Sequence, residues 1–472
     1  MPPAAAVRRP RPVHPRATAG RRLTAVALAA VTASAGLTVP ARAAEGGVRF
    51  SDGGGIQVVN VRRVDDRQYA VRVRTAALGR AVDVRILLPD GYARRASARY
   101  PVLYLLHGTS GRAADWVEAG DAAKTTAGQP LITVMPDAGF DGNGGGWFTD
   151  WADPGTGLGP SKWETFHIGR LIPWIDGNLR TVAGRGGRAV AGLSQGGFGA
   201  MTYAARHPDL FVSAASFSGA PDISSNPVVA AGATAVVSYI ALALNGVNPD
   251  AIFGSRLTDD VNWRGHDPAT LASNLRGMRL ALYTATGIPG PLDPPAPDPA
   301  AICIEALTHV STVSFHQRLK DLKIPSQYTD YVFGTHTFPY WARDLRDHIG
   351  PLMRTFAAPP APPAKVSYRS IDRSWTQWGW TVSLDRRNAR EFSALSDASK
   401  TGFTLRASGA ATVTTPAAYR PGARAIIDVT QGWTHRVIKT TAGPQGRLTI
   451  TLPRAHGAAT TRVSITTPQR AS

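Results

Sequence analysis

Apolar and polar residues alternate along the first part of the chain. Residues 56–88 contain the segments IQVVNV, YAVRVR and AVDVRILL. Alternation with a period of two predicts antiparallel strands that bury one face. Three continuous apolar runs follow at 101–106, 131–135 and 188–191, and such runs are typical of strands buried on both faces.

Helical patterns separate and follow these runs. Apolar residues recur at helical spacing in 163–180, 196–206 and 305–322, and two more strands are expected at 280–284 and 327–333. Strands that alternate with helices predict an α/β domain with a mostly parallel sheet. In such a sheet the reactive groups lie beyond the carboxyl ends of the strands.

The pattern changes after a proline-rich segment. Residues 357–364 read AAPPAPPA, a stiff linker that predicts a domain boundary. Residues 365–472 contain short alternating segments separated by Gly and Pro, among them WGWTVSL at 378–384. We therefore expect an all-β domain, an immunoglobulin-like sandwich, after a catalytic domain at 44–356.

The N-terminal segment is typical of a targeting signal. Residues 1–22 contain six arginines and no acidic residue, an apolar run follows, and Ala41-Arg42-Ala43 precedes Ala44. A basic region, an apolar core and an A-x-A site predict a secretory signal peptide over 1–43. An uncleaved anchor is the alternative, although the apolar run is short for a membrane span. We expect an extracellular mature protein without a transmembrane helix.

Positive charge is concentrated at the two ends of the chain. The formal net charge is +19, and residues 1–43 carry seven of the arginines. Residues 365–472 hold sixteen Lys and Arg against five Asp and Glu, which leaves the middle of the chain nearly neutral. This distribution argues against a nucleic-acid partner for the central domain. The basic C-terminal domain suggests docking on an anionic cell envelope, with an ordinary charged surface as the alternative.

The single cysteine, Cys303, excludes an intrachain disulfide framework. We expect it to be a buried small apolar residue, with a thiol nucleophile as the alternative. The sequence has no C-x-x-C or H-E-x-x-H motif, so neither a metal nor a cofactor is expected.

A candidate nucleophile follows the third apolar run. The segment Gly192-Leu193-Ser194-Gln195-Gly196 matches G-x-S-x-G, which places a serine on a sharp strand-to-helix turn. Gly makes up about a tenth of the chain, so a glycine-rich loop is the alternative for this motif alone.

Ser194 requires a base, and in this fold the histidine follows the nucleophile along the chain. Four histidines lie late enough: His309, His316, His336 and His348. His336 follows an apolar strand on a loop that starts with glycine, a position that suits a catalytic base. The other three fall in helical patterns and are interpreted as surface or packing residues.

The remaining parts of the site are backbone donors and an acid. An oxyanion is expected to be held by the N–H groups of Gln195 and of Thr109, in the loop after the first buried strand. An acid should orient the histidine. Asp293, Asp298 and Glu305 all follow the strand expected at 280–284, and the pattern alone leaves the choice open.

Five segments in one order resemble a known family. They are Leu105-Leu-His-Gly108, Trp147-Phe-Thr-Asp-Trp151, Lys162-Trp-Glu-Thr-Phe166, Gly192-Leu-Ser194, and Gly334-Thr-His336 with Tyr340-Trp341. Across roughly residues 50–355 the chain resembles the antigen 85 mycolyltransferases and related secreted esterases of the esterase D-like α/β-hydrolases. The resemblance implies an α/β-hydrolase fold and a nucleophilic Ser194.

The resemblance also implies which acid is used. The family has a glutamate followed ten residues later by a phenylalanine, with a serine between, and Glu305, Ser311 and Phe315 reproduce this spacing. Glu305 is therefore preferred, with a helix N-terminal glutamate as the alternative. In the implied mechanism His336 deprotonates Ser194, an acyl-enzyme forms, and an alcohol or water resolves it without a cofactor.

The chain also departs from the family. The antigen 85 enzymes have an aspartate at the position of His107 and a Leu-Arg pair at Thr109-Ser110, both beside the sugar acceptor, and a tryptophan at Phe338. The candidate substrate-binding residues are His107, Ser110, Trp147, Trp151 and Phe338, with packing roles as the alternative for the aromatic residues. For His107 the alternatives are a residue that shapes the oxyanion hole and a structural histidine at the end of a strand.

The first functional hypothesis is a secreted enzyme that transfers an acyl group to a hydroxyl acceptor. The acyl group would be of mycolyl type or another long chain, and the acceptor trehalose or a glyceride. The changed acceptor positions favour the alternative, a secreted carboxylesterase that uses water. A non-catalytic protein that binds the cell envelope is the second alternative.

Overall fold

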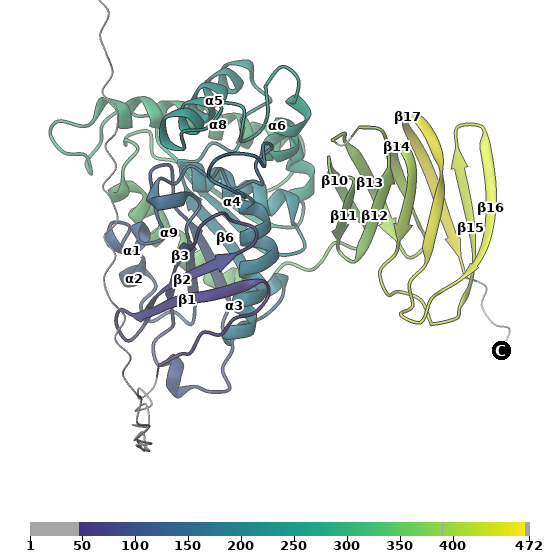
Figure 1. Ribbon diagram of the computed structural model, residues 1–472, viewed down its shortest axis with the longest axis horizontal. Helices are drawn as coiled ribbons and strands as arrows, with labels where there is room; N and C mark the ends of the chain where they lie inside the picture. Colours follow the sequence, from purple (N-terminus) through teal and green to yellow (C-terminus); the bar gives the residue numbers. More distant parts are fainter. Residues whose placement is uncertain (1–46, 389, 468–472) are drawn as a thin grey trace, which may run out of the picture. The chain divides into compact units, whose positions relative to one another are not determined.

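The computed structural model describes residues 47–388 and 390–467 (Figure 1). The signal peptide expected over 1–43 lies outside these residues. Within them, two β-sheets with separate apolar cores correspond to the two patterns in the sequence.

The first sheet has nine strands in the order β1-β2-β3-β5-β4-β6-β7-β8-β9. Neighbours from β1 to β5 pair antiparallel, and the strands from β5 to β9 run parallel. The α/β class with a mostly parallel sheet is thus confirmed. The strands are β1 Ile56–Arg63, β2 Gln68–Thr75, β3 Val82–Leu87, β4 Val102–Leu106, β5 Ile132–Pro136, β6 Arg188–Leu193, β7 Ser213–Phe217, β8 Arg279–Thr284 and β9 Gln327–Asp330.

Helices cover both faces of this sheet, which explains the continuous apolar runs. In β4, Val102, Tyr104 and Leu106 join the core formed with η3, α3, α4 and α8, and Leu103 and Leu105 join the core formed with α1, α2 and α9. The helical segments are α1 Asp115–Glu118, α2 Ala122–Thr125, η3 Thr165–Leu171, α3 Ile172–Asn178, α4 Gln195–Arg206, α5 Pro227–Tyr239, η5 Ile240–Leu244, α6 Asp260–His266, α7 Pro268–Leu271, α8 Pro299–Asp321 and α9 Phe338–Ala357.

The second sheet is entirely antiparallel and has eight strands. The long strand β14 pairs with β13 along its first half and with β12 along its second, and β17 follows both halves. The expected all-β character is confirmed, and its immunoglobulin-like class stays a prediction. The strands are β10 Val366–Ser370, β11 Ser374–Gln377, β12 Trp380–Asp385, β13 Ser393–Ser399, β14 Gly402–Thr414, β15 Arg424–Gln431, β16 Thr434–Thr441 and β17 Thr449–Thr466.

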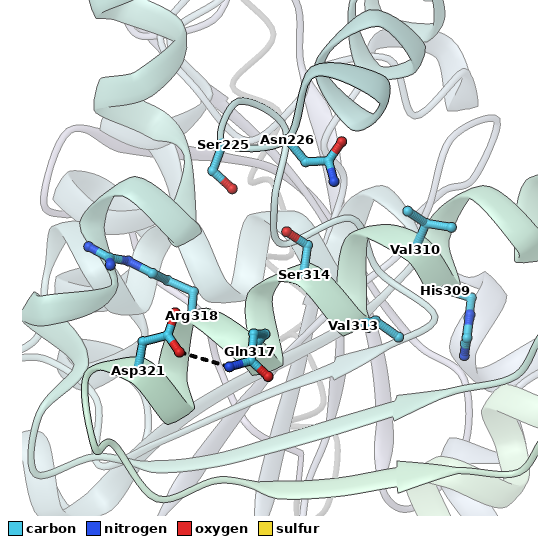
Figure 2. A pocket seen from close by; sticks show the side chains of 9 residues that line it. All are labelled: Ser225, Asn226, His309, Val310, Val313, Ser314, Gln317, Arg318 and Asp321. Carbon is cyan, nitrogen blue, oxygen red and sulfur yellow. Dashed lines mark hydrogen bonds between the residues drawn. The ribbon is translucent and has the colours of Figure 1, made fainter.

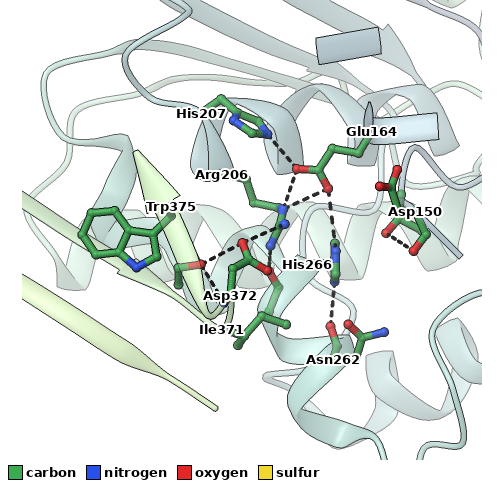
Figure 3. A network of polar contacts seen from close by, with 12 residues as sticks. Asp150, Glu164, Arg206, His207, Asn262, His266, Ile371, Asp372 and Trp375 are labelled. Carbon is green, nitrogen blue, oxygen red and sulfur yellow. Dashed lines mark hydrogen bonds and ion pairs between the residues drawn. The ribbon is translucent and has the colours of Figure 1, made fainter. Parts of the chain in front are cut away.

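A polar network joins the last residue of α4 to the beginning of the all-β segment (Figure 3). The Arg206 carbonyl accepts hydrogen bonds from Tyr368 Oη at 2.7 Å and Gln377 Nε2 at 2.9 Å. The Arg206 guanidinium pairs with Glu164 at 2.8 Å and with Asp372 at 3.2 Å. Burial alone would raise the pKa of Glu164, but Arg206 and two neighbouring histidines hold it well below its usual range. The helix that follows the candidate nucleophile is therefore anchored at its far end.

An apolar helical segment was not expected from the sequence. Among the described residues, Pro227–Leu244, made of α5 and η5, is long and apolar enough to cross a membrane, and 28% of it is buried. No transmembrane helix was expected in the mature chain. Val228, Tyr239 and Leu242 expose large parts of their side chains on this segment.

Two local expectations are wrong. Cys303 is exposed, because α8 buries the side of the helix that carries Glu305 and Phe315. The strand expected at 378–384 instead begins at Trp380. Trp378 and Gly379 both have positive φ and form the turn of a two-residue hairpin between β11 and β12.

Candidate active site

Ser194 lies on a strained turn between β6 and α4. Its backbone has φ 52° and ψ −124°, a conformation that non-glycine residues rarely adopt. A Cβ on Gly192 would lie 2.3 Å from the Gly196 carbonyl oxygen, and one on Gly196 would lie 2.4 Å from the His107 carbonyl oxygen. Both glycines of the G-x-S-x-G motif are thus required for this turn.

The structure brings Glu305 and His336 together. Glu305 Oε2 lies 2.7 Å from His336 Nδ1, and the Glu305 side chain is only 1% exposed. The other carboxylate oxygen, Oε1, accepts hydrogen bonds from Ser218 Oγ at 2.8 Å and from the Ala285 N–H at 2.9 Å. A carboxylate held at three points keeps the proton of the neutral imidazole on Nδ1 and leaves Nε2 as the basic nitrogen.

The basic nitrogen of His336 is free to act. Among residues 47–388 and 390–467, its buried Nε2 has no hydrogen-bond partner. Ser194, Ser218, Ala285 and His336 follow the carboxyl ends of the adjacent parallel strands β6, β7, β8 and β9. The nucleophile candidate and the imidazole therefore lie at the same edge of the sheet, where the ligands of open α/β sheets bind.

The other two candidate acids have different partners. Asp298 is the N-cap of α8 and accepts from the Ala300 N–H at 2.9 Å. Asp293 accepts from the Gly290 N–H at 2.8 Å and from Tyr340 Oη at 2.7 Å. These contacts support the choice of Glu305 beside the imidazole.

The other three candidate histidines pair or pack with residues other than Glu305. His309 Nε2 pairs with Asp330 at 2.8 Å, and His316 stacks on Tyr328 with 4.2 Å between ring centroids. His348 is buried, and burial lowers its pKa to about 3. His309 lines a hollow of about 470 Å³ beside α8, to which Ser194, Glu305 and His336 do not contribute (Figure 2).

The expected oxyanion donors are linked through a side chain. Gln195 is buried, and its Nε2 donates to Thr109 Oγ1 at 2.9 Å. Its Oε1 accepts from the Trp147 N–H at 3.1 Å. Within the described part of the chain, the backbone N–H groups of Thr109 and Gln195 donate to no other protein group. Both remain available for a developing negative charge.

His107 supports the loop that carries Thr109. The Ala138 N–H donates to His107 Nε2 at 2.8 Å, so Nδ1 carries the proton and donates to the Gly108 carbonyl at 2.8 Å. Because the Gly108 carbonyl and the Thr109 N–H belong to one trans peptide, fixing the former orients the latter. His107 therefore has no free ring nitrogen for a substrate, and the geometry gives it a supporting role.

The glycine-rich loop at residues 143–146 packs against the loop that carries Thr109. The Asn143 carbonyl accepts from the Ser110 N–H at 2.8 Å. A Cβ on Gly144 would lie 2.4 Å from the Gly108 carbonyl oxygen, so only glycine fits there. The Asn143 side chain donates to the Leu244 carbonyl at 3.0 Å, which ties the end of η5 to this loop. Asn143 and Gly144 were not predicted from the sequence, although the run of three glycines at 144–146 is an unusual signal.

The aromatic candidates differ in exposure. Trp147 and Trp151 are buried, and Trp147 has a φ of 53° and packs edge-to-face on Phe198. Phe338 is half-buried and packs on Trp341, which itself contacts the His336 ring. Trp147 and Trp151 therefore offer little surface to a substrate.

Ser110 has a φ of 58° and is exposed beside the oxyanion loop. Of the candidate substrate-binding residues, Ser110 and Phe338 offer the more accessible surfaces.

Comparison with known proteins identifies the family of the chain. The family model described as putative esterase matches residues 75–351, and the chain belongs to this esterase family. It is 34% identical over 296 residues to Esterase Rv1288 of Mycobacterium tuberculosis, covering 61% of this chain and 59% of that protein. The chain thus matches less than two thirds of the length of this relative.

The antigen 85-type resemblance is confirmed by a further relative. The chain is 29% identical to the diacylglycerol acyltransferase/mycolyltransferase Ag85A of Mycobacterium gordonae, over 61% of this chain and 81% of that protein. Among solved structures, Mycobacterium tuberculosis MPT51 is similar, with 27% identity and a TM-score of 0.49 over 60% of this chain and 97% of that one.

Proposed function

We propose that the chain is an exported serine esterase that forms an acyl-enzyme on Ser194. The pairing of Glu305 with His336, with Nε2 of the imidazole buried and unpartnered, carries this proposal. Export rests on the targeting pattern of residues 1–43.

The proposed reaction begins when His336 Nε2 accepts the Ser194 hydroxyl proton and the serine oxygen attacks an ester carbonyl. The N–H groups of Thr109 and Gln195 hold the oxyanion, and His336 returns the proton to the leaving alkoxide. Glu305 keeps the imidazole oriented and stabilises its charged form. A second nucleophile, deprotonated by His336, then releases the acyl group.

We assign an apolar acyl group to the substrate. The exposed apolar surface of α5 and η5 supports this assignment, since Asn143 ties the end of η5 to the oxyanion loop. Burying an acyl chain against Tyr239 and Leu242 would gain hydrophobic free energy in proportion to the area covered.

Water is the proposed second nucleophile. In this chain His107 uses both ring nitrogens within the protein, at a position that lies beside the sugar acceptor in the antigen 85 enzymes. His107 therefore offers no free polar atom to a sugar hydroxyl. Transfer to trehalose or a glyceride is the second candidate, favoured by similarity to a relative named as an acyltransferase.

Product analysis distinguishes these acceptors. The purified protein is incubated with nitrophenyl esters of short and long acids, with and without trehalose or glycerol, and the products are identified by mass spectrometry. Free acid alone, absent with Ser194→Ala, supports hydrolysis. Acylated trehalose or glyceride overturns water as the acceptor and leaves the acyl-enzyme in place.

A further inference from the structure

One outer face of the C-terminal sheet carries positive charges that the protein does not neutralise. The pairing registers place Arg406, Arg424, Lys439 and Arg462 on the side opposite the apolar core. All four side chains are exposed. These four residues are called the basic face.

Two acidic residues of the C-terminal segment pair with arginines outside the basic face. Asp385 pairs with Arg454, and Asp372 pairs with Arg206. Asp428 lies on the outer side of β15 with Arg424, 3.5 Å from His435, so the face carries a carboxylate beside its four cations. Within the described residues, no carboxylate lies within ion-pair distance of any member of the basic face. Its charge is therefore available to an external anion.

Hydroxyl groups lie between these cations. Arg462 on β17 is opposite Thr404 on β14 and Thr430 on β15, and Thr430 is opposite His435 on β16. Ser464 and Thr466 continue the same side of β17. Neighbouring strands are about 4.8 Å apart, so Arg462 has a threonine hydroxyl on each neighbouring strand at about this spacing.

A fully exposed tryptophan lies beside this surface. Trp433 is in the turn between β15 and β16 and makes no buried contact with the core. The basic face has few large apolar side chains. In the described part of β15 and β16, Val437 is the exposed large apolar residue. One aromatic ring at the rim suits stacking on a sugar ring better than insertion into a bilayer, which needs a broader apolar surface.

We propose that the basic face binds an anionic glycan, a hydroxylated polymer that carries phosphate or carboxylate groups at intervals. Arginine matches both groups because its planar guanidinium donates two parallel hydrogen bonds to either one. The threonine hydroxyls would contact the sugar units, and Trp433 would stack on one of them. This site is independent of the ester chemistry and would hold the enzyme near a charged envelope polymer.

The test compares two triple variants of the full chain with equal changes in charge. Arg424→Gln, Lys439→Gln and Arg462→Gln remove three of the four positive charges of the basic face. Arg62→Gln, Arg94→Gln and Arg95→Gln neutralise exposed arginines of the α/β part, for which no ion pair is found among the described residues. Binding is measured to polygalacturonate, to a polyglycerol phosphate, to neutral dextran, to DNA and to phosphatidylglycerol-containing vesicles.

The basic-face variant is expected to lose about tenfold in affinity for one or both anionic polymers, polygalacturonate and polyglycerol phosphate, at low salt, and the control less than about twofold. Binding to one glycan identifies phosphate or carboxylate as the recognised group. Trp433→Ala is expected to lose about threefold. Nitrophenyl ester turnover is measured separately from binding. Turnover equal to that of the wild type shows that a variant is folded and that the proposed esterase activity does not depend on the basic face. Equal losses in both triple variants, no glycan binding, or tighter binding to DNA or vesicles overturn the proposal.

Discussion

Gln195 Nε2 donates a hydrogen bond to Thr109 Oγ1 at 2.9 Å, and the same two residues present the free backbone N–H groups beside Ser194. The Gln195 side chain also accepts from the Trp147 N–H. A single buried amide thus holds the two halves of the expected oxyanion hole in register.

Replacing this amide is expected to slow the chemical step. Gln195→Met keeps the side-chain volume but leaves Thr109 Oγ1 and the Trp147 N–H without their partner. We expect kcat to fall about tenfold with little change in KM, because the loosened donors act in the transition state. Steady-state kinetics on a short-chain nitrophenyl ester measure the effect.

A double-mutant cycle with Thr109→Val checks the mechanism. The two substitutions should be strongly non-additive, since each breaks the same hydrogen bond. Additive losses, or a change confined to KM, would remove this role from Gln195.

Glu305→Gln is expected to lower kcat by about a thousandfold or more. The amide keeps the shape of the carboxylate but loses the charge that stabilises the imidazolium, and it disfavours the required tautomer of His336. Asp298→Asn is the matched control, because Asp298 caps α8 and makes no contact with the imidazole. An Asp298 or Asp293 variant as inactive as Glu305→Gln would contradict the assignment.

Asp344 is expected to make stability depend on pH. Burial raises its pKa to about 8, which Arg343 opposes and nearby Glu305 reinforces. The folded protein then keeps a proton that the unfolded chain loses above its ordinary pKa. This contribution to stability is present at low pH and is lost as the pH rises through about 8.

Asp344→Asn should flatten this dependence. Urea unfolding between pH 5 and pH 8 should show a free energy of unfolding that falls less steeply with pH in the variant than in the wild type. The difference in slope is at most about 1.4 kcal/mol per pH unit. Parallel curves for the two proteins would show that Asp344 ionises normally.

Leu242→Asp is expected to affect long acyl esters selectively. Leu242 is 62% exposed on η5, close to the segment that Asn143 ties to the oxyanion loop. Losing its apolar contact should lower kcat/KM for a long-chain ester about tenfold and leave a short-chain ester nearly unchanged. Leu257→Asp, at a position that is 94% exposed outside this helix, is the control. An equal loss of kcat/KM for short and long esters would show that η5 does not bind the acyl chain.

The strands and the elbow were predictable because their patterns are local. The apolar runs of β4 and β6 follow from burial on both faces, and the glycines around Ser194 follow from a turn that excludes a Cβ. The choice of Glu305 needed a family resemblance. Which carboxylate reaches His336 depends on how α8 is placed against β8, and no local pattern encodes that placement.

Other elements carry little periodic signal. The strand β7 reads SAASF, and its short run of mostly small side chains gives no clear strand pattern. The next residue, Ser218, nevertheless donates a hydrogen bond to Glu305. The segment α5–η5 is apolar nearly all round, so it has no polar face to mark it as a helix. His107 was predicted beside a substrate because of its position, but only the structure shows that Gly108 and Ala138 occupy its two nitrogens.

The most direct test of the central claim is covalent labelling of Ser194. The purified protein is treated with a nitrophenyl phosphonate, and the intact mass and the labelled peptide are determined by mass spectrometry. We expect one adduct per chain on Ser194, lost in Ser194→Ala and formed much more slowly in His336→Gln. Failure of the folded wild-type protein to react would contradict the serine mechanism and favour a non-catalytic protein on this fold. A label on Cys303 or another residue would contradict the assignment of Ser194 as the nucleophile.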